Sequence, residues 1–345
     1  MIPSQMRAAV VTEPNEIVVK QVEVPRIGRG DILIRIKYCG ICGTDVSILH
    51  GIYSSEFLPL IPGHEFVGHV AEVGDGVDGF EQGQPVTADI NLGCGRCFYC
   101  RRNAVLMCRE CRQVGIHTNG AFAEYVSVPA SHVYPLSSDM PLENGALIEP
   151  VSNVVRAAKM GGMTIATSVA VIGAGPAGLL HVQMARNHGA APIIVVGKHR
   201  ERLEHARRLG ADFTVLAGQD AVDNVKRVTD GRGADFVIVS VGKTEVYEEA
   251  FRFVRPGGRI MAFGIVEAAG TAQFRPFQLV LGEMSITGSC AGMGNDFFEA
   301  LTLVRYNRFS LEPFTHVKIP LENIQEGFDR VVNDRATLKV LISMD

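Results

Sequence analysis

The sequence predicts an α/β protein in which a small, irregular β-barrel is joined to a doubly wound parallel sheet. The chain has 345 residues, which favours two domains of ~150 residues each over one large core. Its first third carries strand-like alternation of side chains. From about residue 168, short apolar runs alternate with helical patterns, which is typical of a parallel sheet covered by helices.

The barrel is predicted from the first third of the chain. Ile32, Ile34 and Ile36 occupy alternate positions, and residues 66–73 and 122–128 are rich in β-branched and aromatic side chains. Both patterns favour strands. Gly and Pro interrupt these runs every few residues, which fits a small barrel with many turns.

The parallel sheet is predicted from the strand and helix patterns that follow. Strands are expected at 169–172, 193–196, 213–215, 236–240, 259–263 and 285–288, and helices among them at 178–188, 200–209 and 246–254. The tail predicts helices at 296–307 and 321–332 and a closing strand at 338–342. The shorter apolar runs are assigned to strands and the longer periodic segments to helices, because strands are typically shorter than helices.

Composition and charge limit the classes of partner. Apolar residues make up 47% of the chain and charged residues 20%, as in compact globular proteins. The formal net charge of −4 gives no general attraction to nucleic acids or acidic membranes, so neither is expected as a partner. No run approaches the ~18 apolar residues of a membrane span, and residues 1–7 lack a secretory signal. We expect a cytoplasmic protein.

A glycine motif follows the strand predicted at 169–172. The pattern G-x-G-x-x-G precedes a predicted helix and consists of Gly173, Gly175, Pro176, Ala177 and Gly178 together with Ala174. In this setting the first glycine permits the turn, the second lets backbone approach a pyrophosphate, and the third allows the helix to pack on the sheet. The free N–H groups at the helix start favour an anion. The sequence therefore predicts a Rossmann domain that binds a dinucleotide.

The end of the next strand bears on the choice of dinucleotide. NAD sites place an Asp or Glu there, which binds the ribose 2′-hydroxyl. This chain instead has Gly197, Lys198, His199 and Arg200. Glycine leaves room for a 2′-phosphate, and the basic side chains can pair with its charge. We therefore predict NADP(H) over NAD(H), although the same basic residues also suit the solvated first turn of a helix.

Cysteines cluster in the middle of the barrel region. Eight occur in the chain, and a reducing compartment argues against disulfides. The spacing C-x2-C-x2-C-x7-C is formed by Cys94, Cys97, Cys100 and Cys108. Four thiolates at such short spacing suit a closed, tetrahedral structural zinc site. A zinc ribbon for nucleic acid is disfavoured because the flanking segment is only weakly basic.

A second set of metal-binding residue types is scattered along the chain. Cys42, His64 and Glu149 supply the three protein ligands that a catalytic zinc needs beside one open position. Spacing alone gives this triplet only modest support, because single Cys, His and Glu residues more often serve packing or the surface.

The residues around His64 carry a family resemblance. The run Gly63-His64-Glu65-x2-Gly68-x5-Gly74-x2-Val77, with Cys42-Gly43-Thr44-Asp45 upstream, resembles the pattern of the zinc-containing medium-chain dehydrogenases and reductases. The resemblance covers essentially the whole chain. The stretch Glu149-Pro150-Val151-Ser152 is similar to the polyol (sorbitol-type) and threonine dehydrogenase branches, which use Glu where liver-type alcohol dehydrogenases have Cys.

The resemblance implies a GroES-like catalytic domain at 1–155 and 290–345 and a Rossmann domain at 156–289. It also implies two zinc ions per chain and a homodimer or homotetramer. The catalytic zinc would be held by Cys42, His64 and Glu149, and Glu65 would replace or hold its water. Asp45 would orient His64, and Thr44 would begin the proton relay.

The proton relay departs from the family pattern. Many members carry a His five residues after the catalytic Cys, whereas this chain has Ser47 there and His50 further on. Either Ser47 with water or His50 would complete the relay, and the sequence leaves both open.

The sequence thus predicts a zinc-dependent oxidoreductase that transfers a hydride between a secondary alcohol and NADP(H), with the ketone as the oxidised partner. A polyol or sugar alcohol is the leading substrate class. The alternatives are an NAD-dependent threonine-type or simple secondary-alcohol dehydrogenase, a quinone reductase, and a non-catalytic redox sensor that binds zinc and nucleotide.

Overall fold

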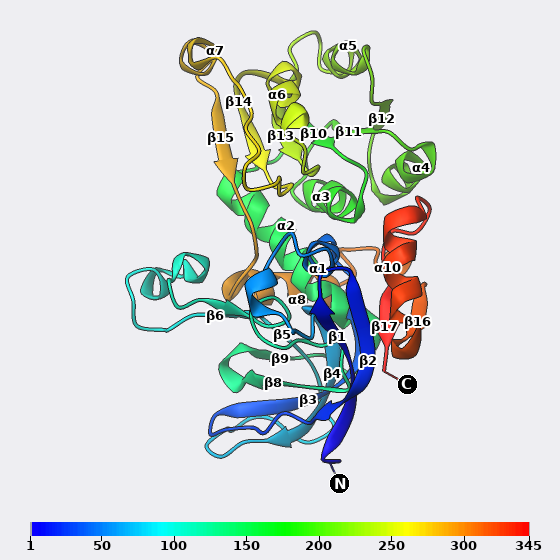
Figure 1. Ribbon diagram of the computed structural model, residues 1–345. Coiled ribbons are helices and arrows are strands. Elements are labelled where there is room, and N and C mark those ends of the chain that lie inside the picture. Colours follow the sequence, from blue (N-terminus) through cyan, green and yellow to red (C-terminus); the bar gives the residue numbers. More distant parts are fainter. Residues whose placement is uncertain (1, 345) are drawn as a thin grey trace. The chain divides into compact units, whose positions relative to one another are not determined.

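The computed structural model describes residues 2–344, and the fold class predicted from the sequence is confirmed (Figure 1). The chain forms two compact units. The first contains Met1–Glu149, Met293–Tyr306 and Leu311–Asp345, and the second contains Pro150–Gly292 and Asn307–Ser310. Each unit has its own sheets and its own hydrophobic core.

The first unit is built on a sheet of seven strands in the order β16-β17-β3-β4-β5-β9, in which β8 also pairs with β3. The strands of this sheet are β3 (Asp31–Gly40), β4 (Glu65–Val73), β5 (Pro85–Ala88), β8 (Tyr125–Pro129), β9 (Val133–Pro135), β16 (Lys318–Pro320) and β17 (Leu341–Ser343). The hairpin of β1 (Gln5–Glu13) and β2 (Glu16–Glu23) is a separate two-stranded sheet, and bridges at Ala8–Ala123 and Val11–Leu60 connect it to loops of the unit. Side chains such as Ile32, Ile34 and Phe122 fill the core.

Short helices connect these strands. They are α1 (Gly43–Leu49), α8 (Asn295–Arg305), α9 (Glu312–Thr315) and α10 (Ile324–Asn333), with 3-10 turns η1 (Ser55–Phe57), η4 (Ala130–His132), η5 (Leu142–Leu147) and η6 (Leu321–Asn323). The helix predicted at 321–332 thus begins with a 3-10 turn. Helix α2 (Ile148–Gly161) starts in the first unit and continues into the second.

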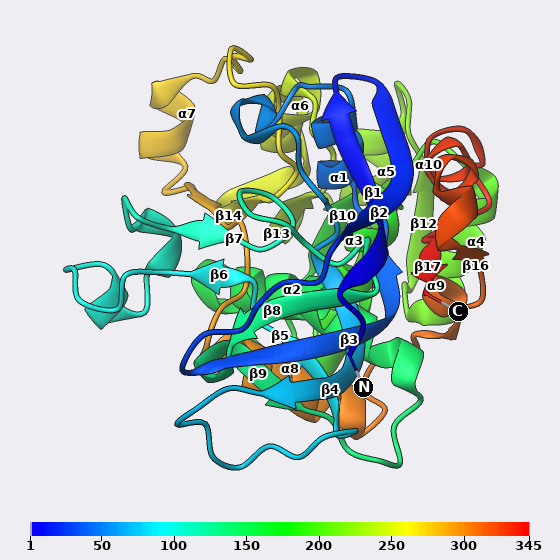
Figure 2. The same ribbon diagram turned by 60° about the horizontal axis from the view of Figure 1, so that its bottom comes forward.

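The cysteine-rich segment forms a lobe of its own. It contains β6 (Asn91–Leu92), the turns η2 (Cys100–Arg102) and η3 (Val105–Met107), and β7 (Arg112–Gln113), which pairs with β6. Figure 2 shows this lobe, in cyan, projecting from the strands of the first unit. The chain enters the lobe through β6 and returns through β7, and the antiparallel pairing of these two strands holds the two ends of the lobe together.

The second unit is a parallel sheet of six strands in the order β12-β11-β10-β13-β14-β15. The strands are β10 (Val169–Ile172), β11 (Ile193–Gly197), β12 (Phe213–Leu216), β13 (Ala234–Val239), β14 (Val254–Ala262) and β15 (Ser285–Gly288). Each alternates with a helix, except that a longer connection containing α7 (Pro276–Leu281) precedes β15. The strand order reverses beside β10, where doubly wound sheets bind ligands.

Helices cover both faces of this sheet. Alternate side chains of β10, β11 and β13 pack on α5 (Ala221–Arg227) and α6 (Thr244–Phe253). On the opposite face, α3 (Pro176–Asn187) and α4 (Arg200–Leu209) contact each other and the strands β10 and β11. Strands buried on both faces explain the continuous apolar runs in this part of the sequence.

Helix α3 contains a histidine that is buried without full hydrogen bonding. His181 is 1% exposed, and its Nε2 has no hydrogen-bond partner among residues 2–344. Its ring contacts Phe263 edge-on, with 4.5 Å between ring centroids. Burial lowers the pKa of His181 to about 3, so the folded protein keeps this imidazole neutral.

Acid should therefore destabilise the fold through His181. Unfolded chains protonate histidine near pH 6.5, so between that pH and about 3 the unfolded state binds more protons and stability falls as pH falls. At pH 5.5 the group should contribute a loss of about 1.4 kcal/mol. The variant His181→Leu should be at least as stable as wild type at pH 7 and gain that amount relative to it at pH 5.5.

Urea unfolding of both proteins at the two pH values measures this difference. The exposed His316 provides the control variant His316→Gln, which should follow the wild-type pH dependence. An equal loss of stability in wild type and His181→Leu between pH 7 and 5.5 would contradict the assignment.

Candidate active site and metal centres

The first candidate metal centre is formed by Cys42, His64 and Glu65. One ligand atom from each lies within 4.8 Å of the other two. Cys42 immediately precedes α1, His64 immediately precedes β4, and Glu65 is the first residue of β4. Sulfur, imidazole nitrogen and carboxylate oxygen are the donor types that zinc accepts, so the donor set fits the ion expected from the sequence.

Asp45 holds this group together. It lies in the first turn of α1 and is fully buried. Its Oδ2 accepts a hydrogen bond from the Cys42 N–H at 2.8 Å, and its Oδ1 accepts one from the Gly63 N–H at 3.1 Å. Oδ1 also lies 3.2 Å from His64 Nδ1. One carboxylate thus fixes the backbone beside both ligands and faces the histidine ring.

The charge environment of His64 follows from this arrangement. Burial opposes protonation, but the Asp45 carboxylate and the Cys42 sulfur outweigh it and raise the pKa of His64 well above its usual value. With Nδ1 directed at Asp45, Nε2 is the nitrogen left for a metal, which is the arrangement that outer carboxylates impose on metal-binding histidines.

Glu65 has a partner that the sequence analysis missed. Its Oε2 forms a buried ion pair with Lys339 Nζ, which also donates to the Ile41 carbonyl at 3.2 Å. Gly40 leaves the space for this carboxylate, since a Cβ there would lie 2.4 Å from Glu65 Oε2. A lysine inside the apolar run 338–342 was the available signal, because such residues are rarely buried unless paired.

The other predicted residues of this centre are placed as follows. The hydroxyl of Thr44 lies 3.8 Å from Cys42 Sγ. Glu149 is buried in the first turn of α2, and it does not belong to the close group of ligand atoms that the described residues form. Ser47 Oγ donates to the Gly43 carbonyl at 3.1 Å, and the exposed His50 contacts Asn15 Oδ1 through Nδ1 at 2.7 Å.

The second candidate metal centre lies in the projecting lobe. The sulfur atoms of Cys94, Cys97, Cys100 and Cys108 all lie within 4.8 Å of one another. The Cys94–Cys100 pair is 3.9 Å apart, close to the ~3.8 Å that tetrahedral bonds of ~2.3 Å to zinc require. Backbone N–H groups of Arg96 and Cys97 lower the pKa of Cys94 to about 6. The four donors therefore fit a structural zinc, and Cys111 is outside the group.

The glycine motif lies where β10 passes into α3. Gly173 has a φ of 112°, which favours glycine. A Cβ on Gly178 would lie 1.9 Å from the Gly173 carbonyl oxygen, whereas a Cβ on Gly175 would meet only Arg202 Nη1, at 4.0 Å. The third glycine thus allows close packing, and the second leaves open space at the start of α3, where Pro176 and Ala177 form the first turn.

The residues at the end of β11 are also placed. Lys198 and Arg200 are exposed, and His199 immediately precedes α4. A Cβ on Gly197 would lie 3.0 Å from Leu203 Cδ2 and 3.1 Å from the Ala174 Cβ, so glycine here also has a packing reason. Arg202, which the sequence analysis missed, is the basic residue nearest to Gly175.

The variant Asp45→Asn tests whether Asp45 holds Cys42 and His64 in position to bind a metal. The change removes the charge that faces His64 and one acceptor for backbone N–H groups. We expect the zinc affinity of the Cys42 and His64 centre to fall ~10–100-fold, as for other residues that orient metal ligands, while the four-cysteine centre keeps its ion. Zinc per chain, measured during titration with a chelator, reports both.

Asp334→Asn is the matched control, because Asp334 also accepts a backbone hydrogen bond but lies in a surface turn. Its zinc content should equal that of wild type. Unchanged retention of both ions in Asp45→Asn would show that Asp45 does not hold the ligands.

Among residues 2–344, no helix is long and apolar enough to cross a membrane.

Comparison with known proteins identifies the family. Residues 28–138 match the alcohol dehydrogenase GroES-like domain, and residues 176–305 match the zinc-binding dehydrogenase domain. The chain is 32% identical to L-threonine 3-dehydrogenase of Pyrococcus horikoshii over 90% of both chains. It is 28% identical to D-arabinitol dehydrogenase 1 of Uromyces fabae over 99% of this chain and 98% of that one.

A solved structure extends the similarity to three dimensions. A protein of Sinorhizobium meliloti 1021, described as a zinc-binding dehydrogenase bound to NADP, superposes with a TM-score of 0.93 at 31% identity, over 99% of this chain and 100% of that chain. The chain belongs to the zinc-containing medium-chain alcohol dehydrogenase family, in the branch of the polyol and threonine dehydrogenases, and it is an alcohol or polyol dehydrogenase.

Proposed function

We propose that this dehydrogenase transfers a hydride between the secondary alcohol group of a polyol or sugar alcohol and NADP(H), and that it holds two zinc ions per chain. The observation that carries the proposal is the group of Cys42, His64 and Glu65, of which His64 and Glu65 are buried. Asp45 holds the backbone beside Cys42 and His64. The alternative within the family is an NAD-dependent enzyme for threonine or a simple secondary alcohol.

The roles of the residues follow from their positions. Cys42 and His64 would hold the catalytic zinc. The family resemblance implies Glu149 as the third ligand, whereas Glu65 is the carboxylate that lies beside the other two donors. Cys94, Cys97, Cys100 and Cys108 would hold the structural zinc. Zinc at the first site supplies a Lewis acid that lowers the pKa of a substrate hydroxyl. Thr44, beside Cys42 Sγ, would begin the relay that carries the hydroxyl proton away.

Glu65 and the proton relay complete the site. The ion pair with Lys339 neutralises the Glu65 carboxylate, so Glu65 would stand near the metal without adding a full negative charge. Ser47 would pass the proton on through water, because His50 is exposed and bonded to Asn15. The start of α3, with its open space at Gly175, would bind the pyrophosphate.

Assembly and location stay predictions. A homodimer or homotetramer is supported by the exposed side chains of Phe277, Val280 and Leu281 on α7, which are 75%, 70% and 70% exposed, since apolar patches of this kind mark interfaces. The neighbouring β15 is an edge strand of its sheet. Light scattering of the purified protein would measure the number of chains. A cytoplasmic location is expected from the sequence.

Turnover is tested by absorbance at 340 nm with zinc-replete protein. Polyols, hydroxy-amino acids and simple secondary alcohols are each offered with NADP⁺ and with NAD⁺, and we expect the fastest reduction with polyols. Cys42→Ala should abolish turnover and leave one zinc per chain with an unchanged far-ultraviolet circular dichroism spectrum. Cys111→Ala, which removes a cysteine outside both groups, should keep two zinc ions and full activity.

Two results would contradict the proposal. Wild-type activity in Cys42→Ala would remove the catalytic centre from this site. Turnover of threonine or a simple alcohol, with polyols inactive, would establish the alternative substrate class.

Cofactor preference is tested by the basic residues near the glycine motif. We expect a lower KM for NADP⁺ than for NAD⁺ in the wild type. Lys198→Ala and Arg202→Ala should each raise the KM for NADP⁺ ~10-fold or more, because a charged hydrogen bond contributes roughly 1.5–3 kcal/mol, with a smaller effect on NAD⁺.

Lys226→Ala is the control, since Lys226 is exposed on α5. It should leave both KM values unchanged. A wild-type preference for NAD⁺ would overturn the cofactor assignment while leaving the alcohol chemistry intact.

A further inference from the structure

A histidine outside the metal centre is held in a defined orientation. His117 lies in the loop between β7 and β8, and its Nδ1 accepts a hydrogen bond from the Gln113 N–H at 3.0 Å. Its own backbone N–H donates to the Gln113 carbonyl at 2.8 Å. Its ring meets Phe57 edge-on, with 5.2 Å between centroids. Because Nδ1 is an acceptor, the neutral ring carries its proton on Nε2.

The anchor of His117 is rigid. Gln113 is buried, and its Nε2 donates to Asn91 Oδ1 at 2.7 Å. Asn91 Nδ2 donates to Asp89 Oδ1 at 2.7 Å, and Asp89 Oδ2 accepts from the Gly294 N–H at 2.8 Å. A buried, fully connected polar network of this kind fixes its members in one arrangement, so the turn that positions the His117 ring is fixed as well.

The charge state of His117 suits a hydrogen-bond donor. Partial burial and the nearby Arg112 guanidinium lower the pKa of His117, and the opposing effect of Glu56 is smaller. The ring is therefore neutral at pH 7 and presents Nε2–H. The side chain is only partly buried, and the hydrogen bonds that His117 forms with the described residues are made by Nδ1 and by its backbone.

The His117 loop is part of the wall behind the metal centre. The Gly120 N–H donates to the Ile61 carbonyl at 2.7 Å, and the Ala121 N–H donates to the Gly63 carbonyl at 2.8 Å. A Cβ on Gly115 would lie 3.1 Å from the backbone nitrogen of His64. The segment that carries His64 therefore packs directly on the loop that carries His117.

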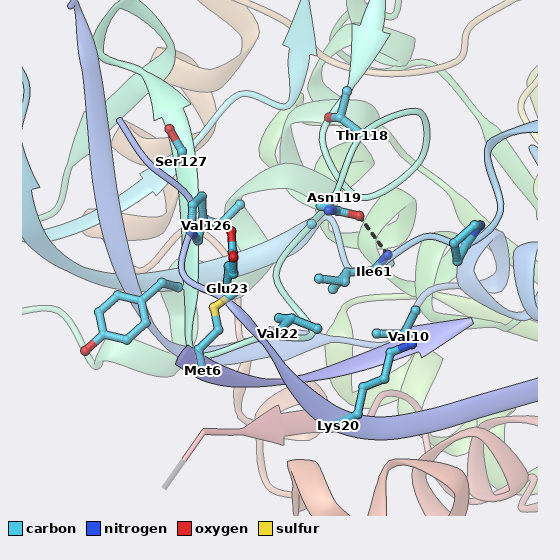
Figure 3. A pocket seen from close by; sticks show the side chains of 14 residues that line it. Met6, Val10, Lys20, Val22, Glu23, Ile61, Thr118, Asn119, Val126 and Ser127 are labelled. Carbon is cyan, nitrogen blue, oxygen red and sulfur yellow. Dashed lines mark hydrogen bonds between the residues drawn. The ribbon is translucent and has the colours of Figure 1, made fainter. Parts of the chain in front are cut away.

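The residues that follow His117 in this loop line a cavity. A space of about 520 Å³ is lined by Thr118, Asn119 and Gly120 together with residues of β1, β2 and β8. Figure 3 shows Asn119 accepting a hydrogen bond from the Ile61 N–H in this cavity. Thr118 lines this cavity, whereas His117 and the candidate metal and cofactor residues do not.

We propose that His117 is a specificity-determining residue whose Nε2–H donates a hydrogen bond to a substrate hydroxyl other than the one that is oxidised. This inference rests on the proposed function and names its substrate class, since an N–H donor beside Arg112 selects an oxygen acceptor and opposes an ammonium group. The enzyme then prefers a polyol to a secondary alcohol with a single hydroxyl.

The test compares D-arabinitol with 2-butanol. His117→Phe keeps an aromatic ring against Phe57 but has no donor, and it should lower kcat/KM for D-arabinitol ~10-fold relative to that for 2-butanol, the effect of one lost hydrogen bond. His117→Gln, which restores a donor near the Nε2 position, should recover part of this ratio. Thr118→Val is the matched control at the neighbouring position and should leave the ratio unchanged.

A binding measurement separates this inference from the proposed function. With NADP⁺ present, D-arabinitol should raise the melting temperature of wild type more than 2-butanol does, through ligand binding to the folded state, and His117→Phe should lose this excess. Equal shifts for the two alcohols in wild type, or an excess that survives in His117→Phe, would overturn the role of His117. Absence of turnover with the excess present would instead count against the proposed function.

Discussion

The buried carboxylate of Asp45 is the interaction on which the metal centre depends. A fully buried charge is costly unless it is hydrogen-bonded, and Asp45 meets this requirement with two backbone N–H groups, one on each of the segments that carry Cys42 and His64. The same contacts that satisfy the carboxylate therefore set the separation of the ligands. Asp45 thus connects the start of α1 to the segment just before β4.

A second buried charge pair closes the site from the side of the C-terminus. Lys339 and Glu65 are 274 positions apart in sequence, and each would be costly to bury alone. Strand β17 pairs with β3, and this pairing carries the lysine to the carboxylate. The C-terminal segment thus contributes to the metal centre as well as completing the sheet.

The candidate cofactor site of the second unit depends mostly on backbone conformation, in contrast to the metal centre, which depends on side chains. Gly173, Gly175 and Gly178 each serve turn geometry, open space or close packing, so the residue types needed are visible in the sequence. Gly197 is less simple, since packing against Leu203 and Ala174 also requires a small residue there. The exposed Lys198 and the Arg202 side chain near Gly175 therefore favour a 2′-phosphate more strongly than Gly197 does.

The sequence by itself determined the features that depend on short spacing. The alternation of strands and helices, the glycine motif and the cysteines 94–108 are local patterns, because hydrophobic period and ligand spacing act over a few residues. Residue type alone gave Cys42 and His64 only modest support as ligands, and Asp45 became a candidate through the family resemblance; the fold brings the three together. The family comparison confirmed the fold class and the enzyme class.

Tertiary structure decided the contacts between distant segments. The pairing of Lys339 with Glu65, the approach of Arg202 to Gly175 and the contact of His117 with Phe57 arise from strand order and loop packing. Nothing in the spacing of these residues along the chain specifies such contacts, since many topologies are compatible with the same local pattern. Their chemistry became visible only when the sheet and its loops placed them side by side.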